Sequence, residues 1–487
     1  MGIVLRQGFK NTIFTYLGFL VGAIYTILLV PKVFDTHPEH WGTARFLVSY
    51  ALVIAPWAQL SIPNIIIRYF PIFKSKNKES FVFFIIFWTS TGIIISSLFI
   101  IFFSHLWFTP TSNKLIIQNS FLVFPIFIGY ILFEVAAAFS KSLFKSTIPI
   151  FLKEFLLRFN VLALIILYWY NLINFTQFIY LFAFNYVLIF IILFLYLFSL
   201  KKLSLKINFD VIKESDFRPI YTYAIFNILS VSAGMLILNI DTLMINHYLS
   251  LKDVAIYGPS LFIASSILVP SRSLQSIIAP VVANSWATND LNTIKELYKR
   301  SAIAPLTITI FLFLIIWINI DLVMNYFGKT FGQGKYVVLL LSLGHIINIA
   351  TGINGTIINT SKHYKADLYF QIILVTLAVV MNIIFIPIYG LNGAALASAI
   401  TFGLYNFFKS MYVLYKFKLH PYSIKSLYIL IIGASIFLIY SIVPKWNLFW
   451  SSVLYSIVLS IIYWIIVYFA NISEDINKLI NKLKITK

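Results

Sequence analysis

The most constraining feature of this sequence is a succession of long apolar runs separated by short polar breaks. A bilayer-spanning helix needs about 20 predominantly apolar residues. Of the 487 residues, 60% are hydrophobic and only 11% are charged. The chain is therefore predicted to be an all-α integral membrane protein with about 14 transmembrane helices. The predicted spans cover residues 12–31, 43–67, 81–104, 115–139, 148–170, 176–199, 221–247, 256–283, 301–320, 336–359, 368–388, 392–415, 425–443 and 449–470.

The same composition argues against several classes of protein. An ordinary soluble domain carries about 25% charged residues, more than twice the share found here. The longest break between apolar runs, 200–220, is too short for a folded soluble domain. The absence of Cys removes thiolate chemistry and Cys-type zinc sites, and the chain has no phosphate-loop, HExxH or GxSxG motif. We therefore expect a protein that is not an enzyme and has no cofactor and no metal site.

Basic residues alternate from break to break along the chain. If the N-terminus is cytoplasmic, the inner segments carry 23 Lys and Arg and the outer loops carry five. This asymmetry follows the positive-inside rule and predicts cytoplasmic termini. The net charge of +20 is therefore interpreted as a topology signal facing anionic lipid, and no nucleic-acid partner is expected. The basic tail, 471–487, is predicted to be a cytoplasmic amphipathic segment on the membrane surface; a solubilising tail is the alternative.

An internal repeat indicates two related halves. Gly42, Pro56 and Pro63 of the second predicted span correspond to Gly258, Pro270 and Pro280 of the eighth, at offsets of 214 to 217 residues. Six spans per half predict two parallel lobes related by a pseudo-two-fold axis along the membrane normal, the geometry of alternating access around a central cleft. The predicted organisation is a six-helix lobe over 1–200, a second over 201–415, two extra helices over 416–470 and the tail.

Polar residues inside the predicted spans are the candidate site. Residues on one face of the first span and of the seventh share helical spacing, which predicts either a cleft lining or close helix packing. Intramembrane arginines are candidates for holding an anionic substrate, because a guanidinium pairs with phosphate in a bidentate way; snorkelling to the membrane surface is the alternative. The candidate substrate-binding residues are Arg272, Arg68, Arg45, Asn64, Gln275, Asn11, Asn227 and Ser230.

Three carboxylates are candidates for ion coupling. Glu134 lies deep in the fourth span, Glu154 is four residues before Arg158 in the fifth, and Asp241 lies near the outer end of the seventh. A structural ion-pair cluster is the alternative for Glu134 and Glu154, and a carboxylate that binds H⁺ or Na⁺ is the functional hypothesis.

Several second-half segments resemble one family. Residues 239–248, 254–258, 278–280 and 382–399 resemble the corresponding spans of polysaccharide (Wzx-type, O-antigen) flippases of the multidrug/oligosaccharidyl-lipid/polysaccharide (MOP) exporter superfamily. The resemblance implies a MATE/MOP-like fold and movement of an undecaprenyl-diphosphate-linked oligosaccharide, the repeat unit of an O-antigen, exopolysaccharide or capsule, across the bacterial inner membrane. It also implies ion-gradient energy, membrane lipids as partners, and polysaccharide-assembly machinery as a candidate partner.

Three alternatives remain open at this point. A lipid II flippase of cell-wall synthesis shares 14 spans and cationic cleft residues. A MATE-type drug/cation antiporter typically has 12 spans, which disfavours it. A membrane glycosyltransferase or polymerase would usually carry a large external loop or clustered catalytic carboxylates, and neither is found in the sequence.

Overall fold

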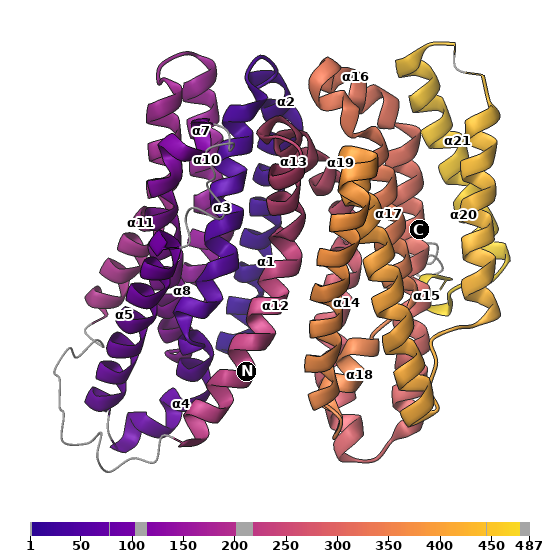
Figure 1. The fold of residues 1–487 in the computed structure, drawn as a ribbon. Coiled ribbons are helices and arrows are strands. Elements are labelled where there is room, and N and C mark those ends of the chain that lie inside the picture. Colours follow the sequence, from indigo (N-terminus) through magenta and orange to yellow (C-terminus); the bar gives the residue numbers. More distant parts are fainter. Residues whose placement is uncertain (1, 77, 103–113, 201–217, 445, 478–487) are drawn as a thin grey trace. The chain divides into compact units, whose positions relative to one another are not determined.

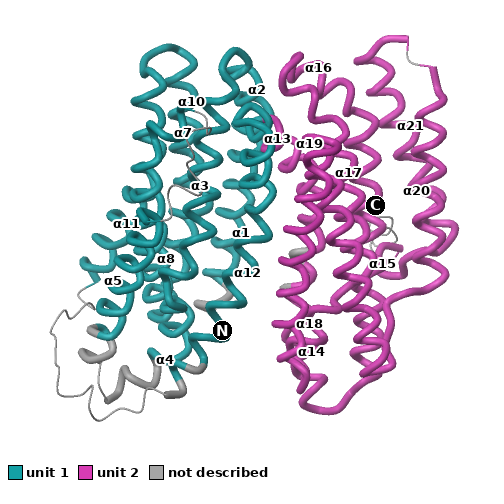
Figure 2. Tube along the Cα trace, viewed as in Figure 1, with its two compact units in different colours: residues 1–255 teal, residues 256–487 magenta. Residues whose placement is uncertain are grey.

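The computed structural model describes residues 2–76, 78–102, 114–200, 218–444 and 446–477, and these residues are mostly helical. They divide into two compact units, 1–255 and 256–487 (Figure 2). Each unit is described separately below. The predicted cytoplasmic loop at 201–217 and the end of the tail, 478–487, lie outside the described residues.

The first unit is a bundle of helices that follow the predicted apolar runs (Figure 1). Its helices are α1 (Gly2–Ala23), η1 (Ile24–Leu29), α2 (Val30–Val33), α3 (Pro38–Gln59), α4 (Ile62–Lys76), α5 (Lys78–Phe102), α7 (Lys114–Asn119), η2 (Ser120–Leu122), α8 (Val123–Ser142), α9 (Thr147–Ile150), η3 (Phe151–Leu156), α10 (Leu157–Trp169), α11 (Phe175–Ser199) and α12 (Arg218–Tyr248). Of these, η1 and η3 are short π-helices.

The second unit continues from α13, which begins in the first. Its helices are α13 (Leu251–Ser266), α14 (Val269–Ala287), α15 (Leu291–Ile318), α16 (Ile320–Phe331), η5 (Gly332–Gly334), α17 (Lys335–Ala350), α18 (Asn354–Thr360), α19 (Lys365–Phe417), α20 (Ile424–Ile442) and α21 (Leu448–Phe469). Asp290 caps α15 by accepting a hydrogen bond from the Thr293 backbone N–H at 3.0 Å. The Thr293 hydroxyl, and after it the Thr293 backbone N–H, donate hydrogen bonds that hold the pKa of Asp290 below its ordinary value.

Two predicted breaks, at Pro270 and at Gly390, are found in the structure, and the second predicted span contains a further bend. Pro270 lies in the first turn of α14, directly after the end of α13. The chain leaves helical geometry at Gly390, whose φ of 59° and ψ of −133° favour glycine, and α19 continues on either side of it. The second predicted span is bent by 45° between α3 and α4, at Leu60 and Ser61, which both have positive φ. Pro56 lies inside α3, one turn before this bend.

The length and composition of the helices identify the candidate membrane spans. Among the described residues, ten helices are long and apolar enough to cross a membrane, and up to eleven if the bent pair α3–α4 is one span. The 53-residue α19 is counted once among them although it covers two predicted spans. The segment from α9 to α10 is not among them, and Lys153, Glu154 and Arg158 interrupt its apolar run. The predicted total of 14 remains a prediction.

The lobe boundaries also remain predictions. The second lobe was expected from residue 201, whereas the spatial division falls at residue 255. Helix α12 is grouped with the first unit because it packs against α3 and α4.

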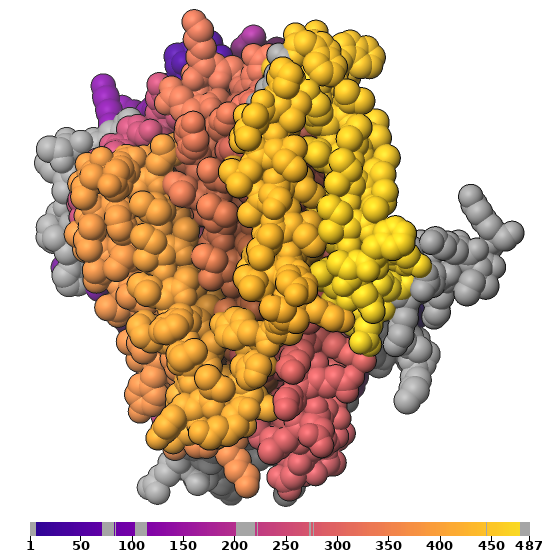
Figure 3. Space-filling model, turned by 90° about the vertical axis from the view of Figure 1, so that its right-hand side faces the viewer, coloured from indigo at the N-terminus to yellow at the C-terminus, as the bar shows by residue number. Residues whose placement is uncertain are grey.

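The last helices of the second unit combine a packed face with an exposed one. Ile429 and Ile436 of α20, and Leu459 and Tyr463 of α21, belong to one buried cluster with α15. Figure 3 shows the outer side of α20 and α21 in yellow beside the orange α19. Large apolar side chains of both helices are exposed there, as expected for helices that face lipid. They include Leu427, Ile431, Leu438, Ile457, Ile461 and Ile465.

The described part of the tail packs on the protein. Ile472 is fully buried in the same cluster, and Ile476 is also buried. The Asn477 side chain donates to the Tyr468 carbonyl at 3.2 Å. The expected membrane-surface position is therefore wrong for Ile472 and Ile476, because the core of the second unit offers them an apolar surface.

Candidate functional site

Charged side chains gather in the interior of the first unit. Lys153 of η3 pairs with Glu134 of α8 at 2.5 Å, and its ammonium lies 5.5 Å from the ring centroid of Tyr130. Arg158 of α10 pairs with Glu154 at 3.0 Å, as the i,i+4 spacing predicts. All four charged side chains are partly shielded from solvent, with exposed fractions of 17 to 40%. Both carboxylates are therefore ion-paired, which is the structural alternative; their ion-coupling role remains a prediction.

Arg45 completes this cluster from α3. From Trp41 to Ala51, it is the one residue that is not fully buried. Tyr186 of α11 interacts electrostatically with Arg45, Arg158 and Tyr130, so the cations of two helices, α3 and α10, lie near one tyrosine. Within the described residues, Arg45 forms no ion pair, while each carboxylate of the cluster has its own cation. We call Arg45, Glu134, Lys153, Glu154, Arg158 and Tyr186 the inner charge cluster; its excess charge is the Arg45 guanidinium.

The polar stripe of α1 packs against the segment that carries this cluster. The Asn11 amide donates to the Ser146 hydroxyl at 3.0 Å. Gly18 lies against the backbone of Glu154: a Cβ added there would come within 1.9 Å of the Glu154 carbonyl oxygen. This contact agrees with close helix packing, one of the two interpretations of the α1 stripe. A contact of Asn11 with substrate remains a prediction.

The predicted residues of the second and seventh spans meet each other directly. Asn227 of α12 accepts hydrogen bonds from Ser61 at 2.8 Å and from Asn64 of α4 at 2.6 Å. The Arg68 guanidinium lies 4.5 Å from the ring centroid of Tyr223, a cation–π contact. Arg68 itself is exposed, so both its snorkelling and its substrate-binding interpretations stay open. Farther along α12, Ser230 and Asp241 are half-buried.

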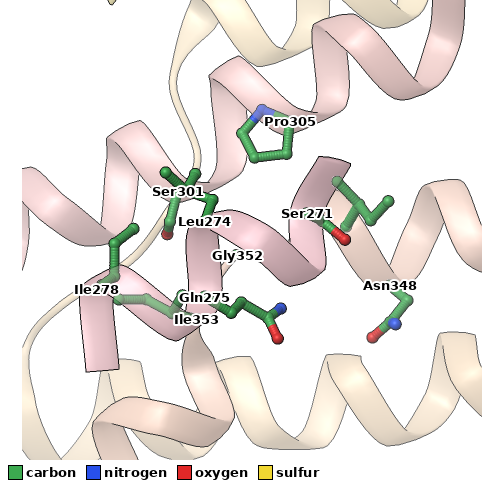
Figure 4. Close-up of a pocket in the computed structure, with 10 residues that line it drawn as sticks. Ser271, Leu274, Gln275, Ile278, Ser301, Pro305, Asn348, Gly352 and Ile353 are labelled. Carbon is green, nitrogen blue, oxygen red and sulfur yellow. The ribbon is translucent and has the colours of Figure 1, made fainter. Parts of the chain in front are cut away.

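A small polar pocket lies inside the second unit (Figure 4). Ser271 and Gln275 of α14, Ser301 of α15 and Asn348 of α17 contribute its polar lining, and Gly352 lies among them. Gln275 lies among these polar side chains, and its contact with substrate remains a prediction. The Arg272 side chain falls outside the described residues, although its backbone belongs to α14. Its contact with substrate remains a prediction.

A buried polar network continues from this pocket. Asn406 of α19 donates to Asn348 at 2.9 Å and accepts from Thr351 at 3.1 Å. One turn beyond Asn406, Lys409 pairs with Asp367 at 2.8 Å, with exposed fractions of only 6% and 15%. Because Asp367 lies near the start of α19 and Lys409 near its end, this pair joins the two parts of α19 on either side of Gly390.

This buried pair was not predicted from the sequence. The signal was present in the sequence: Lys409 lies inside the predicted span 392–415, where an ionisable side chain needs a partner. Asp367 was overlooked because it stands just before the span predicted at 368–388.

One further group of side chains was also missed. His37, Glu39 and His40, around the start of α3, lie close enough together to hold a metal ion.

The fold of this chain is similar to those of known membrane transporters. The structure of the lipid II flippase MurJ in an inward closed conformation superposes with a TM-score of 0.69 over 95% of this chain and 99% of that chain, at 18% identity. An outward-facing multidrug-resistance MATE transporter of the MOP superfamily gives a TM-score of 0.56 over 84% of this chain, at 13% identity. The MatE family model matches residues 227–384. The matched residues are about a third of the chain, and the superpositions show that the chain shares the fold of these transporters.

One curated relative adds a likeness at the level of sequence. The probable low-salt glycan biosynthesis flippase Agl15 of Haloferax volcanii is 23% identical over 206 residues. The match spans 42% of this chain and 43% of the relative, so it covers less than half of either chain. The region of the MatE match, 227–384, contains the candidate residues Asn227, Ser230, Asp241, Arg272 and Gln275.

Proposed function

We propose that this protein is a flippase of the MOP superfamily that moves an undecaprenyl-diphosphate-linked oligosaccharide from the inner to the outer leaflet of a bacterial inner membrane. The observation that carries the proposal is the inner charge cluster: a chain of apolar helices holds an arginine in excess over its carboxylates. A polar group that enters hydrocarbon without partners costs several kcal/mol, and a charged group costs far more. A sugar diphosphate therefore needs a protein surface that replaces water.

The chemistry of the cluster fits a diphosphate head group. A guanidinium presents a planar fork of donors that matches phosphate oxygens, and Arg45 has no carboxylate among its described contacts to compete with such a ligand. The glycan biosynthesis flippase among the relatives supports the same class of substrate.

An ion gradient is the energy source that we propose. The predicted loops hold no soluble nucleotide-binding domain, and the spans contain carboxylates. Glu134, Glu154 and Asp241 are the coupling candidates from the sequence. We add Asp367 as a fourth coupling candidate. It is a carboxylate within the helical bundle that forms an ion pair with Lys409.

Deletion of the gene tests this function. The mutant should lose one surface glycan and accumulate its lipid-linked precursor in the inner leaflet, and a plasmid copy should restore export. Normal display of every surface glycan, in a strain without a second flippase, would overturn the proposal.

A lipid II flippase is the second candidate, favoured by the match over 99% of the MurJ chain. The same deletion distinguishes the two. Loss of lipid II transport would stop growth and accumulate peptidoglycan precursor, whereas loss of a glycan flippase would leave peptidoglycan synthesis intact. A drug/cation antiporter would instead change only the sensitivity of the cells to toxic cations.

A further inference from the structure

The start of α3 brings together three side chains that suit a transition-metal ion. His37, Glu39 and His40 each offer one ligand atom, and these atoms all lie within 4.8 Å of one another. The His37 Nδ1 and Glu39 Oε1 atoms are 3.3 Å apart. In a tetrahedral zinc site with bonds of about 2.0–2.1 Å, neighbouring ligand atoms are separated by about 3.3–3.4 Å. Two of the three ligands thus already stand at this spacing.

The side chain that must move to complete the site, that of His37, is exposed. The His37 side chain is 60% exposed, and its ring stacks on that of His40 with centroids 5.1 Å apart, so solvent leaves room for it to rotate toward an ion shared with His40. Glu39 and His40 are half-buried. The negative charge of Glu39 also opposes the partial positive charge of the helix N-terminus, which would otherwise repel a cation.

His40 is held in place by residues outside the ligand group. Its Nδ1 atom is 2.9 Å from the Tyr168 hydroxyl, and its ring stacks on Phe175 with centroids 3.8 Å apart. Tyr168 in turn stacks on the buried Phe34 at 5.2 Å. When Nδ1 donates to the hydroxyl, Nε2 carries the lone pair that a metal needs. Outer contacts of this kind orient most metal-binding histidines and fix their tautomer.

We propose that His37, Glu39 and His40 form a binding site for Zn²⁺ at the end of the first unit opposite the N-terminus (Figure 1). Two imidazoles and one carboxylate favour zinc over Mg²⁺ or Ca²⁺, which prefer oxygen ligands. Under the predicted topology this end faces the outside of the cell. The site is independent of the proposed transport function.

Zinc titration of the purified full-length protein tests the proposal. The protein should carry an affinity tag without histidine and be measured by calorimetry. We expect one equivalent of Zn²⁺ that is lost in the His37→Ala/His40→Ala double variant. The matched control is His247→Ala/His420→Ala, which removes two exposed histidines outside the group and should bind like the wild type. Gel filtration and thermal melting show that each variant is folded.

Two further measurements examine the assigned contacts. Tyr168→Phe should weaken zinc binding about 10- to 100-fold, the usual effect of removing an outer contact of a metal ligand. X-ray absorption of the zinc-loaded wild type should show nitrogen and oxygen ligands at about 2.0–2.1 Å. Equal stoichiometry and affinity in the wild type and in the His37→Ala/His40→Ala variant would overturn the site. Unchanged affinity in Tyr168→Phe would remove the orienting role of that tyrosine.

Discussion

At the scale of single residues, the Lys409–Asp367 pair makes the sharpest stability prediction. The Lys409 side chain is buried, the Asp367 side chain is only 15% exposed, and the Lys409 ammonium also lies 4.8 Å from the Tyr405 ring centroid. Asp367→Asn should destabilise the protein by about 3–5 kcal/mol, because it leaves an uncompensated buried charge. The measurement is thermal unfolding in detergent, together with the abundance of the protein in the membrane.

The Lys335–Asp321 pair is the matched control, since both of its side chains are about 30% exposed. Asp321→Asn should cost less than about 1 kcal/mol, as surface ion pairs usually do. The double variant Asp367→Leu/Lys409→Met should be more stable than Asp367→Asn, because it removes both charges together. Equal destabilisation by Asp367→Asn and Asp321→Asn would contradict a special role for the buried pair.

Arg45 gives the second prediction at this scale. Arg45→Ala should lower transport about 10- to 150-fold under limiting substrate, because a charge-assisted hydrogen bond contributes about 1.5–3 kcal/mol. Arg45→Lys should retain part of the activity, since the charge remains without the planar fork. Arg300→Ala removes a partly exposed arginine that pairs with Glu296 and should transport normally. Full transport by an abundant Arg45→Ala protein would rule out substrate binding by this side chain.

At the scale of helices, the contact between α1 and η3 makes a prediction that compares two glycines of α1. Gly18→Ala should lower the melting temperature, because its Cβ would overlap the Glu154 carbonyl and push α1 away from the inner charge cluster. Gly8 has no atom within 4 Å of an added Cβ, so Gly8→Ala should be neutral or stabilise α1 by about 0.5–1 kcal/mol. If the Gly18→Ala and Gly8→Ala proteins have the same melting temperature, α1 does not pack closely against the Glu154 backbone in solution.

Most helices could be predicted from the sequence, and their local irregularities could not. Apolar runs long enough to span a bilayer give α5, α11, α20 and α21 to within a few residues, since the membrane leaves few alternatives to helix. The break at Gly390 could be predicted because glycine adopts backbone angles that other residues rarely do. The π-helix η3 has no comparable local signal. Among helices that are not adjacent in the sequence, η3 packs against α1 and α11.

The candidate site shows the same division. The Glu154–Arg158 pair follows from i,i+4 spacing on one helix and was predicted. The partners of Glu134 and Lys409 are 19 and 42 residues away, so they depend on how separate helices pack. The contacts of Asn227 with Ser61 and Asn64 likewise join helices far apart in the sequence. A single sequence names the polar residues inside the spans, and tertiary packing decides which of them meet.

At the scale of the whole molecule, the basic asymmetry predicts which loops face the cytoplasm. The chain contains no Cys, so single cysteines can be introduced without removing native ones. Lys252→Cys should react with a membrane-impermeant maleimide in intact cells, whereas Lys362→Cys should react only after permeabilisation. Both positions are exposed. The reverse pattern would invert the predicted topology.

Reconstitution tests the central claim of lipid-linked oligosaccharide transport most directly. Purified protein in liposomes receives a fluorescent undecaprenyl-diphosphate oligosaccharide in one leaflet, and an impermeant quencher reports how much reaches the other. Wild-type protein should equilibrate the lipid faster when an ion gradient is imposed, and Arg45→Ala should be slower while Arg300→Ala is not. A rate equal to that of protein-free liposomes, from folded protein under every imposed gradient, would contradict the account.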